Sequence, residues 1–386
     1  MLRLLHTADV HLGARHADLG EQAAAQRERQ FAAFRATIDL AIEERVDLFL
    51  IAGDLFDSNT QPRRSVERVA AELHRLVEGR IRTVLIPGTH DVYDRASIYR
   101  THDLPALAGA TGTDLVTLLT PEVPTVVLET LDVSVHGGVF ATKRAPRSPL
   151  EAFSVAGDPS TWQIGLIHGS IAIPNQTDHD EVVITLDEIA ASGLDYLALG
   201  HWHSSSKGRA GSTTYAYPGA PEPVALDQDR AGNVLIVSLE SQDGAKVVKV
   251  EERKVGRTHF EKVELDAAAV ATQPALVEQL AARADPDLVL DVRLIGIRPD
   301  LLDVHVDEVE SELAGKFLKV RVRDRSMPAL SEGPLPSGDT VLGAFVRDTQ
   351  AEITQLEAAN DQDAAAELRD VLRLGRLLLA GEAVTL

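Results

Sequence analysis

Five segments of the chain carry histidine or aspartate residues of the types that bind metal ions, and four of them follow a run of apolar residues. Imidazole and carboxylate groups together suit manganese, iron or zinc. The candidate ligands are Asp9, His11, Asp54, His168, His201 and His203, with His90 beside them. In Asp9-x-His11 and in His201-x-His203 the residues lie two apart where the chain leaves a strand, so both members of a pair can reach one metal cluster.

The stretch from 48 to 57 gives the clearest position for one of these carboxylates. Residues 48–52 are apolar and predict a buried strand, which stops at Gly53 and presents Asp54 at its carboxyl end. In open α/β sheets, ligands bind outside the carboxyl ends of the strands. A carboxylate shared by two ions about 3.5–4 Å apart is the usual arrangement for hydrolysing phosphate esters. The pattern therefore predicts a two-metal site at this edge of the sheet.

A structural role is the alternative for each of these residues taken alone. A single histidine at a strand end is more often a satisfied core residue than a ligand, and one Asp-x-His pair has little specificity. The repetition of such residues in five segments favours metal binding. Asp57 lies one turn beyond Asp54 and is expected to support a ligand or to cap the loop rather than to bind the metal.

The surrounding sequence predicts the elements that must bring these residues together. Apolar runs predict three early strands, at 2–7, 48–52 and 82–87. Helical periodicity predicts two helices between them, from about 21 to 45 and from about 65 to 78. This alternation indicates right-handed βαβ units and a largely parallel start. From 115 onward β patterns dominate, and two further strands lead into ligands, at 164–168 and 196–200. The fold class is therefore α/β.

The chain is expected to divide into four parts. The first domain covers 1–260, and a small second region, 261–328, reads as helix, strand, helix, strand. Residues 329–339 are rich in proline and glycine and are typical of a linker. Residues 340–386 predict two amphipathic helices with a break at Asn360-Asp361. These tail helices either pack on their own domain or dock on a partner protein.

Composition limits the classes of function. The chain has 386 residues and no cysteine, so disulfides and thiolate metal sites are excluded. No stretch of 18 apolar residues and no signal peptide are found, so we expect a cytoplasmic protein that does not span a membrane. The net charge of -21 disfavours broad binding of phosphate backbones. Metal ions or a local basic patch must supply positive charge if nucleic acid is the substrate.

Five motifs together resemble those of the calcineurin-like metallophosphoesterases. They are Asp9-x-His11, Gly53-Asp-Leu-Phe-Asp57, Gly88-Thr-His-Asp91, His168-Gly169 and Gly200-His-Trp-His203. The fuller stretches His6-Thr-Ala-Asp-Val-His-Leu-Gly13 and Ala198-Leu-Gly-His-Trp-His203, with Tyr217-Pro-Gly219, resemble the SbcD-type DNA-repair exonucleases. The motifs cover residues 1 to about 225, and the remainder matches that family only in layout.

The resemblance implies a fold, an activity and partners. The expected fold is a two-sheet β-sandwich flanked by helices, with a small α+β capping domain and a helical C-terminal tail. The expected activity is a two-metal-dependent DNA phosphodiesterase, an exonuclease or endonuclease that uses Mn²⁺, with iron or zinc as other possibilities. The expected partners are DNA and an SbcC-type, SMC-like ATPase that the tail helices would contact, and family members commonly form homodimers.

The resemblance also implies a role for each motif residue. The first metal would bind Asp9, His11 and His203, the second would bind His168 and His201, and Asp54 would bridge them. His90 would stabilise the transition state or protonate the leaving oxygen, and Asp91 would orient His90. Thr89 stands where the family has an asparagine whose amide oxygen binds the second metal. Because a hydroxyl is a poorer ligand, we expect weaker binding of the second metal.

Two basic segments are candidate contacts to DNA. In the predicted strand 317–325, basic residues alternate with apolar ones and so project from one face: Lys319, Arg321, Arg323 and Arg325. The alternative is a solvated sheet face whose charges pair with acids of the neighbouring helix. Lys143 and Arg144 form a second, weaker candidate.

Two other functions remain open at this point. A phosphodiesterase for small nucleotides or other phosphoesters would use the same metals, in a closed pocket rather than an open basic cleft. A largely non-catalytic scaffold that recruits an ATPase would bind metals without turnover. Fold-level similarity does not decide between substrates.

Overall fold

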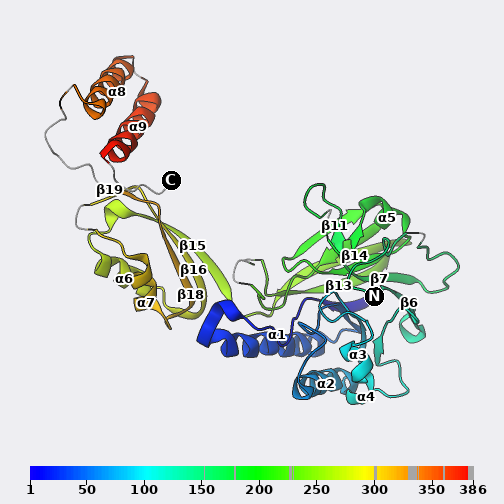
Figure 1. Ribbon diagram of the computed structural model, residues 1–386. Coiled ribbons are helices and arrows are strands. Elements are labelled where there is room, and N and C mark those ends of the chain that lie inside the picture. The colour runs from blue at the N-terminus through cyan, green and yellow to red at the C-terminus, as the bar shows by residue number, and fades with distance from the viewer. Residues whose placement is uncertain are drawn as a thin grey trace. The chain divides into compact units, whose positions relative to one another are not determined.

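The computed structural model describes residues 1–151, 153–177, 180–225, 228, 230–299, 302–328, 337, 339–359 and 361–380. Within the chain, two compact units form, Met1–His259 and Phe260–Leu386. Figure 1 shows the elements of both units, coloured along the chain.

The first sheet of the first unit has six strands in the order β14-β13-β1-β2-β3-β4. Its strands are β1 (Leu2–Thr7), β2 (Leu48–Ala52), β3 (Arg82–Ile86), β4 (Val116–Leu118), β13 (Asn233–Gln242) and β14 (Ala245–Lys254). The strands β1 to β4 pair in parallel, and β13 joins β1 antiparallel. The carboxyl ends of β1, β2 and β3 therefore meet at one edge.

The second sheet also has six strands, in the order β11-β12-β10-β7-β6-β5. Its strands are β5 (Thr125–Leu128), β6 (Val133–Gly138), β7 (Trp162–His168), β10 (Tyr196–Gly200), β11 (Ser206–Ala210) and β12 (Thr213–Tyr217). The strands β6, β7, β10 and β12 run parallel. The chain thus forms the two-sheet α/β sandwich that was predicted.

Packing explains why the strand before Asp54 reads as a continuous apolar run. In a strand, successive side chains point to opposite faces. Phe49 and Ile51 face the helices, whereas Leu48 and Leu50 face the second sheet. Each is fully buried, and burying such a side chain contributes roughly 1.5–3 kcal/mol. A strand covered on both sides therefore has no polar face.

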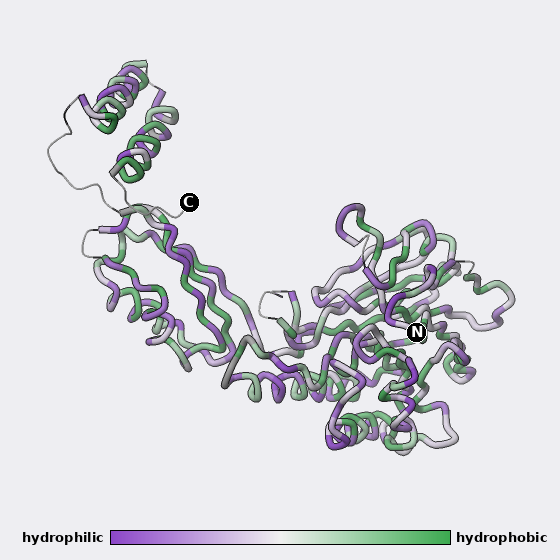
Figure 2. Tube along the Cα trace, in the orientation of Figure 1, coloured by the Kyte–Doolittle hydropathy of each residue, from purple (hydrophilic) through white to green (hydrophobic). Residues whose placement is uncertain are grey.

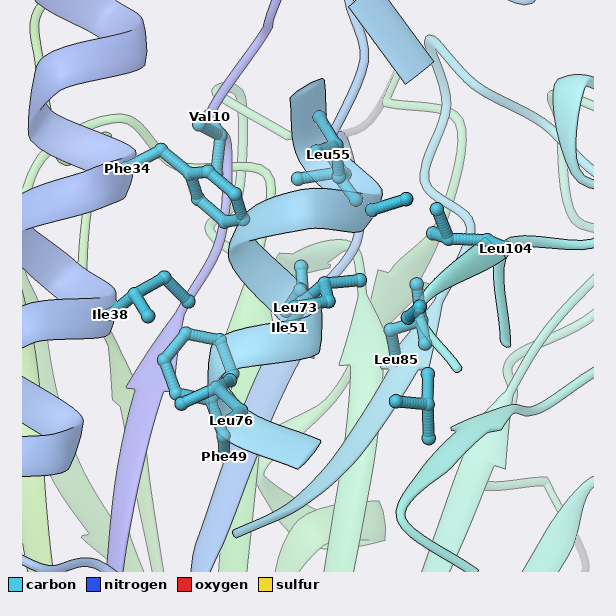
Figure 3. Close-up of a cluster of buried hydrophobic side chains, with 14 of the residues drawn as sticks. Val10, Phe34, Ile38, Phe49, Ile51, Leu55, Leu73, Leu76, Leu85 and Leu104 are labelled. Atoms are coloured by element: carbon cyan, nitrogen blue, oxygen red, sulfur yellow. The ribbon is translucent and has the colours of Figure 1, made fainter. Parts of the chain in front are cut away.

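Two helices cover the outer face of the first sheet: α1 (Ala23–Glu43) and α2 (Arg63–Glu78). They lie side by side, and Figure 3 shows their side chains converging on the strands. Phe34 and Ile38 of α1 and Leu73 and Leu76 of α2 are all fully buried there. The helical periodicity in the sequence arises from this one-sided burial. Both predicted helices are present, with ends shifted by about two residues.

Short elements complete the first unit. They are η1 (Ala17–Gln22), α3 (Ile98–Thr101), α4 (Leu104–Leu107), η2 (Glu129–Leu131), β8 (Ser170–Ile171), β9 (Val183–Ile184) and α5 (Leu186–Ala191). A capping box between Thr185 and Glu188 starts α5, whose Ile189 packs with Leu197 and Leu199 on the outer face of the second sheet. The first unit therefore has helices on both outer faces of its sandwich.

The second unit contains a three-stranded sheet in the order β15-β16-β18 with its own apolar core. Its elements are β15 (His259–Asp266), η3 (Ala267–Ala269), α6 (Gln273–Ala281), β16 (Asp285–Ile295), β17 (Ile297–Arg298), α7 (Val306–Leu313), β18 (Phe317–Asp324) and β19 (Met327–Pro328). The strand β15 is an addition to the predicted helix-strand-helix-strand pattern. Its polar residues are too numerous to give a clear strand signal.

Two amphipathic helices follow, α8 (Val341–Ala358) and α9 (Gln362–Ala380). They contact each other, and Gly375 of α9 lies against the ring of Phe345. Apolar and polar residues alternate along both (Figure 2), and Val341, Val371 and Leu378 are exposed. Of the predicted linker 329–339, only 337 and 339 belong to the described residues, and Asn360 also lies outside them. Among the helices of the described residues, none has the length and apolarity that a membrane span requires.

Candidate metal centre

Strand ends of both sheets place the candidate ligands of the first unit. Asp9 and His11 follow β1, Asp54 follows β2, and the loop 88–91 follows β3. In the second sheet His168 is the last residue of β7, and His201 directly follows β10. Because these strands are parallel within each sheet, each set of ends lies at one edge of its sheet.

Among the residues that the structure describes, three overlapping groups of side chains have ligand atoms within 4.8 Å of one another. They are Asp9 with His11 and His203; Asp9 with Asp54 and His168; and His11 with Asp57 and His90. Oδ2 of Asp54 lies 3.1 Å from Nε2 of His168 and 3.6 Å from Nε2 of His11. Asp54 is thus placed between two histidines, as a bridging ligand must be.

The donor atoms around His168 fit a cation. Its Nδ1 lies 2.9 Å from the carbonyl oxygen of Ala52 and donates to it, so Nε2 faces Asp54, with a lone pair in the neutral ring and a proton in the charged ring. That Nε2 is buried and makes no hydrogen bond within the described residues, although Asp54 Oδ2 is only 3.1 Å away. Two lone pairs at this distance repel each other unless a proton or metal ion lies between them. The hydrogen bond from Nδ1 to Ala52 also fixes the orientation of the ring, as is usual for a histidine that binds a metal.

The rings of His11 and His203 are also linked through their nitrogens. Nε2 of His11 lies 3.2 Å from Nε2 of His203. On its other side, His11 Nδ1 contacts Asp57 Oδ1 at 3.2 Å, and His203 Nδ1 lies 2.6 Å from Nε2 of Gln228. Asp57 therefore supports His11, as expected from its position one turn beyond Asp54. Gln228 orients His203, and no motif in the sequence marked it.

Electrostatics also favour bound cations here. Burial raises the pKa of Asp9 to about 6. Burial opposes the charge of Asp54 too, but the neighbouring His168 and His11 hold its pKa well below the usual range. Burial alone would lower the pKa of His168, yet the adjacent Asp54 raises it to about 10. Burial lowers the pKa of His203 to about 3, so this ring is neutral and able to bind a metal.

The backbone is bent at the ligands. Positive φ angles occur at Asp9 (52°), His11 (47°), Asp54 (51°) and His201 (103°). Non-glycine residues rarely adopt this region, at a cost of about 1–3 kcal/mol each. The packed sandwich sets this geometry, which turns the side chains that follow the strands toward one another.

The second metal's expected ligands are less tightly gathered than the first's. The ring of His201 lies 5.2 Å, centroid to centroid, from that of His168, and its Nε2 is 4.0 Å from Asp180 Oδ2. The backbone N–H of His201 donates to both oxygens of Asp9 at 3.0 Å. His201 thus borders the centre without joining the three groups within 4.8 Å. Asp180 is a further contact that sequence reasoning missed.

The loop after β3 shows which groups Asp91 and His90 contact. Its carboxylate accepts hydrogen bonds from the backbone N–H of Gly88 (2.7 Å), from that of Phe56 (3.1 Å) and from the hydroxyl of Tyr99 (2.6 Å). The ring Nδ1 of His90 instead donates to the carbonyl of Asp57 at 3.1 Å. Asp91 thus has no hydrogen bond to the His90 ring among these contacts, and any orientation of His90 by Asp91 would act through the loop backbone. Asp91 holds the loop, and the backbone N–H of His90 contacts Asp54 Oδ1 at 2.7 Å.

Thr89 is held rigidly within this loop. Its neighbours Gly88 and His90 both donate their backbone N–H groups to buried carboxylates, and Thr89 itself is 7% exposed. We expect Thr89→Asn to lower the Mn²⁺ concentration for half-maximal activity by about tenfold, because an amide oxygen is a better ligand than a hydroxyl. The measurement is a Mn²⁺ titration of phosphodiester hydrolysis. Thr89→Val, which lacks the oxygen, is the matched control, and equal midpoints for all three proteins would contradict the expectation.

Glycine is required where strands approach the centre. A Cβ on Gly200 would lie 2.0 Å from the carbonyl oxygen of Ala52, which is backbone and cannot swing away. We expect Gly200→Ala to lower the free energy of unfolding by about 1–3 kcal/mol, as overpacking does. Chemical denaturation measures this change. Gly79→Ala is the control, because a Cβ there has an ordinary nearest contact of 3.4 Å; equal losses in both variants would refute the steric account.

The candidate DNA contacts of the second unit lie on the sheet face opposite its core. Arg321 is exposed, and Arg323 pairs with Asp291 of the neighbouring β16 at 3.2 Å. The alternative interpretation placed the paired acids on the neighbouring helix. The acid that pairs with Arg323 instead belongs to a neighbouring strand. Lys319 is half-buried on the same face. Arg325 follows β18, and its N–H donates to Leu294.

The weaker candidate pair lies in the first unit. Lys143 forms an ion pair with Glu181 at 3.6 Å, and Arg144 is exposed in the same loop. Glu181 offsets the charge of Lys143, so this loop offers less net positive charge than its sequence suggested.

Comparison with known proteins identifies the class. The sequence model of the calcineurin-like phosphoesterase family matches residues 2–205. This range is more than half of the chain and includes every candidate metal ligand. The chain belongs to this family. The family match confirms the resemblance and the expected class of phosphoester hydrolase.

Individual relatives are more distant. The DNA double-strand break repair protein Mre11 of Aeropyrum pernix is 30% identical over 69% of this chain and 64% of the relative. The Mre11 protein of Methanopyrus kandleri is 24% identical over 93% of this chain and 80% of the relative. The uncharacterized metallophosphoesterase YhaO of Bacillus subtilis is 25% identical over 72% and 66%. The chain thus matches slightly less than two thirds of the Aeropyrum relative's length.

Proposed function

We propose that this protein is a two-metal-dependent DNA phosphodiesterase that acts in DNA repair. The observation that carries the proposal is the placement of Asp54 between His11 and His168, within a buried set of carboxylates and imidazoles. The names of the Aeropyrum and Methanopyrus relatives, which are DNA double-strand break repair proteins, support DNA as the substrate.

The residues present divide the chemistry among them. Asp9, His11 and His203 would hold one divalent ion, His168 and His201 would hold the other, and Asp54 would contact both. Divalent ions at such a site polarise phosphoryl oxygens and generate a nucleophile from water near neutral pH. Mn²⁺ is the ion we propose, because oxygen and imidazole ligands without thiolates suit it.

His90 is proposed to act on the substrate itself. Its side chain is 44% exposed, whereas those of His11 and His168 are almost completely buried. Its ring centroid lies 4.6 Å from that of His11. From this position the ring can donate a hydrogen bond or a proton to an oxygen of the reacting phosphate. Asp91 supports this role by holding the loop backbone that carries His90.

The second unit carries the surfaces that are proposed to contact DNA and a partner protein. The exposed face with Arg321 is proposed to contact the DNA backbone, which a chain of charge -21 needs in order to retain a polyanion. The apolar residues exposed on α8 and α9 are proposed to dock on an SMC-like ATPase. A homodimer and a cytoplasmic location are parts of the same proposal.

A second candidate function is hydrolysis of small nucleotides or other phosphodiesters. The relative YhaO is named only as a metallophosphoesterase, so it does not favour DNA over a small substrate. A scaffold without turnover is the third possibility, and the same experiment separates all three.

The test is metal-dependent cleavage of labelled single- and double-stranded DNA, with bis(p-nitrophenyl) phosphate as a small phosphodiester. We expect the full chain to cleave DNA in Mn²⁺, to stop when EDTA removes the metal, and to resume when Mn²⁺ is returned. Hydrolysis of the small ester alone would replace DNA by a small substrate. Two bound metals without hydrolysis of any substrate would favour the scaffold.

A further inference from the structure

A pocket of about 350 Å³ in the first unit adjoins the loop that follows His11. Its walls come from three segments: the loop 12–15 that follows His11, the first turns of α1, and the start of α2 from 61 to 68. None of the metal ligands lines it. It is therefore a separate concave site within the same compact unit.

The pocket is positively charged in an acidic protein. The residues that line it include four arginines and one acid: Arg15, Arg27, Arg64, Arg68 and Glu28. Arg68 donates two hydrogen bonds to Glu28, at 2.9 and 2.8 Å, so these two charges cancel. Within the described chain, no carboxylate lies within ion-pair distance of Arg15, Arg27 or Arg64. Four guanidinium groups against one carboxylate leave an excess of positive charge in the pocket, which favours an anion.

The pocket also offers a flat surface. The guanidinium carbon of Arg68 lies 3.7 Å from the ring centroid of Phe31, and Glu28 holds the group from the side. One face of the guanidinium therefore rests on the phenyl ring. Arg68 lines the pocket and its side chain is 40% exposed, so part of the guanidinium is accessible to a ligand. Guanidinium planes that are held in this way stack well on nucleobases.

Backbone contacts join the pocket to the metal loop. The N–H of Leu12 donates to the carbonyl of Leu55 at 3.0 Å, and the N–H of Asp57 donates to the carbonyl of Leu12 at 3.1 Å. Leu12 lines the pocket and directly follows His11, while Asp57 contacts the His11 ring. The pocket and the metal centre are thus built on the same pair of linked loops.

We propose that the pocket binds one unstacked nucleotide of a single-stranded nucleic acid, with the base on Arg68 and the phosphate between Arg15, Arg27 and Arg64. This inference rests on the proposed function, since it names the form of substrate that the same site takes. A base inside a duplex is stacked on both faces and cannot cover Arg68 without leaving its neighbours. The pocket therefore selects single strands over duplexes.

The test is equilibrium binding of the full chain in Mn²⁺ to fluorescent phosphorothioate oligonucleotides, which resist cleavage. The probes are a single strand, its duplex and an abasic strand of the same length. We expect the single strand to bind tightest. Arg68→Lys keeps the charge but loses the planar face, and it should weaken single-strand binding at least about fivefold while leaving the abasic strand unaffected.

Arg64→Ala tests the phosphate contact, and Arg63→Ala is its matched control. Both residues are in the first turn of α2, but Arg63 pairs with Glu67 and does not line the pocket. Arg64→Ala should weaken binding of all three probes and flatten their salt dependence, with Arg63→Ala unchanged. Unfolding midpoints of each variant exclude misfolding as the cause. Single-strand binding by Arg68→Lys and Arg64→Ala equal to that of Arg63→Ala would overturn the inference.

The proposed nuclease function and the proposed nucleotide pocket can be disproved independently of each other. A chain that cleaves DNA, but whose binding ignores Arg68 and Arg64, keeps the proposed function and loses this pocket. A chain that selects single strands through both arginines, yet never hydrolyses a phosphodiester, keeps the pocket and loses the nuclease.

Discussion

Asp54→Asn is expected to reduce phosphodiester hydrolysis by at least about a thousandfold and to lower the metal content of the protein. The carboxylate is 1% exposed and lies within 3.6 Å of the ligand nitrogens of both His11 and His168. An amide keeps one oxygen but loses the charge that attracts two cations, and its NH₂ group cannot bind a metal. Metal stoichiometry by elemental analysis, together with the rate in saturating Mn²⁺, measures both effects.

Asp57→Asn is the graded control for this prediction. Asp57 contacts His11 Nδ1 rather than the space between the histidines, so it acts through the orientation of that ring. Its loss should cost about 10- to 100-fold in metal affinity or activity, as is typical of groups that support a ligand. If Asp54→Asn were no worse than Asp57→Asn, Asp54 would not be the bridging ligand.

His90→Ala is expected to lower kcat by about 10²- to 10⁴-fold, the usual contribution of a positioned acid or base, while two metals remain bound. The ring is 44% exposed and its Nδ1 is occupied by the carbonyl of Asp57, so its Nε2 is available to the substrate. Single-turnover kinetics with metal analysis separates loss of chemistry from loss of metal. His102→Ala, a histidine outside the centre, is the control.

The same variant decides between two roles for His90. It also belongs to a group with His11 and Asp57 whose ligand atoms lie within 4.8 Å of one another. Loss of one metal from His90→Ala would show that His90 is a ligand rather than a group that acts on the substrate. Rescue of the rate by added imidazole, with both metals present, would support the catalytic role.

The sequence was sufficient to predict those features that depend on residues close together in the chain. The apolar run before Asp54 is continuous because β2 is covered on both faces, and the helices that follow β1 and β2 show the periodicity of one buried face. Parallel strands carry their carboxyl ends to a common edge, so residues placed just after them had to gather there. Strand ends, ligand types and the class of fold are therefore readable from the chain alone.

Long-range contacts were not readable. Gln228 lies 25 residues from His203, and the hydrogen-bond partners of Asp91 include the backbone of Phe56, 35 residues away. Which side chains meet at such separations depends on the order of the strands and on loop conformation, and neither leaves a periodic pattern. The left-handed backbone at Asp9 and Asp54 is likewise set by the surrounding packing.

The sequence by itself indicated a candidate carboxylate and imidazole centre in an α/β sandwich of the phosphoesterase family, because the candidate ligands lie at or shortly after the ends of strands. The tertiary structure alone decided which residues support those ligands, that Asp91 holds the loop backbone, and that four arginines from three separate segments line one pocket. The physical reason is that spacing along a chain encodes local geometry, whereas the meeting of distant segments is decided only when the sheets and helices pack.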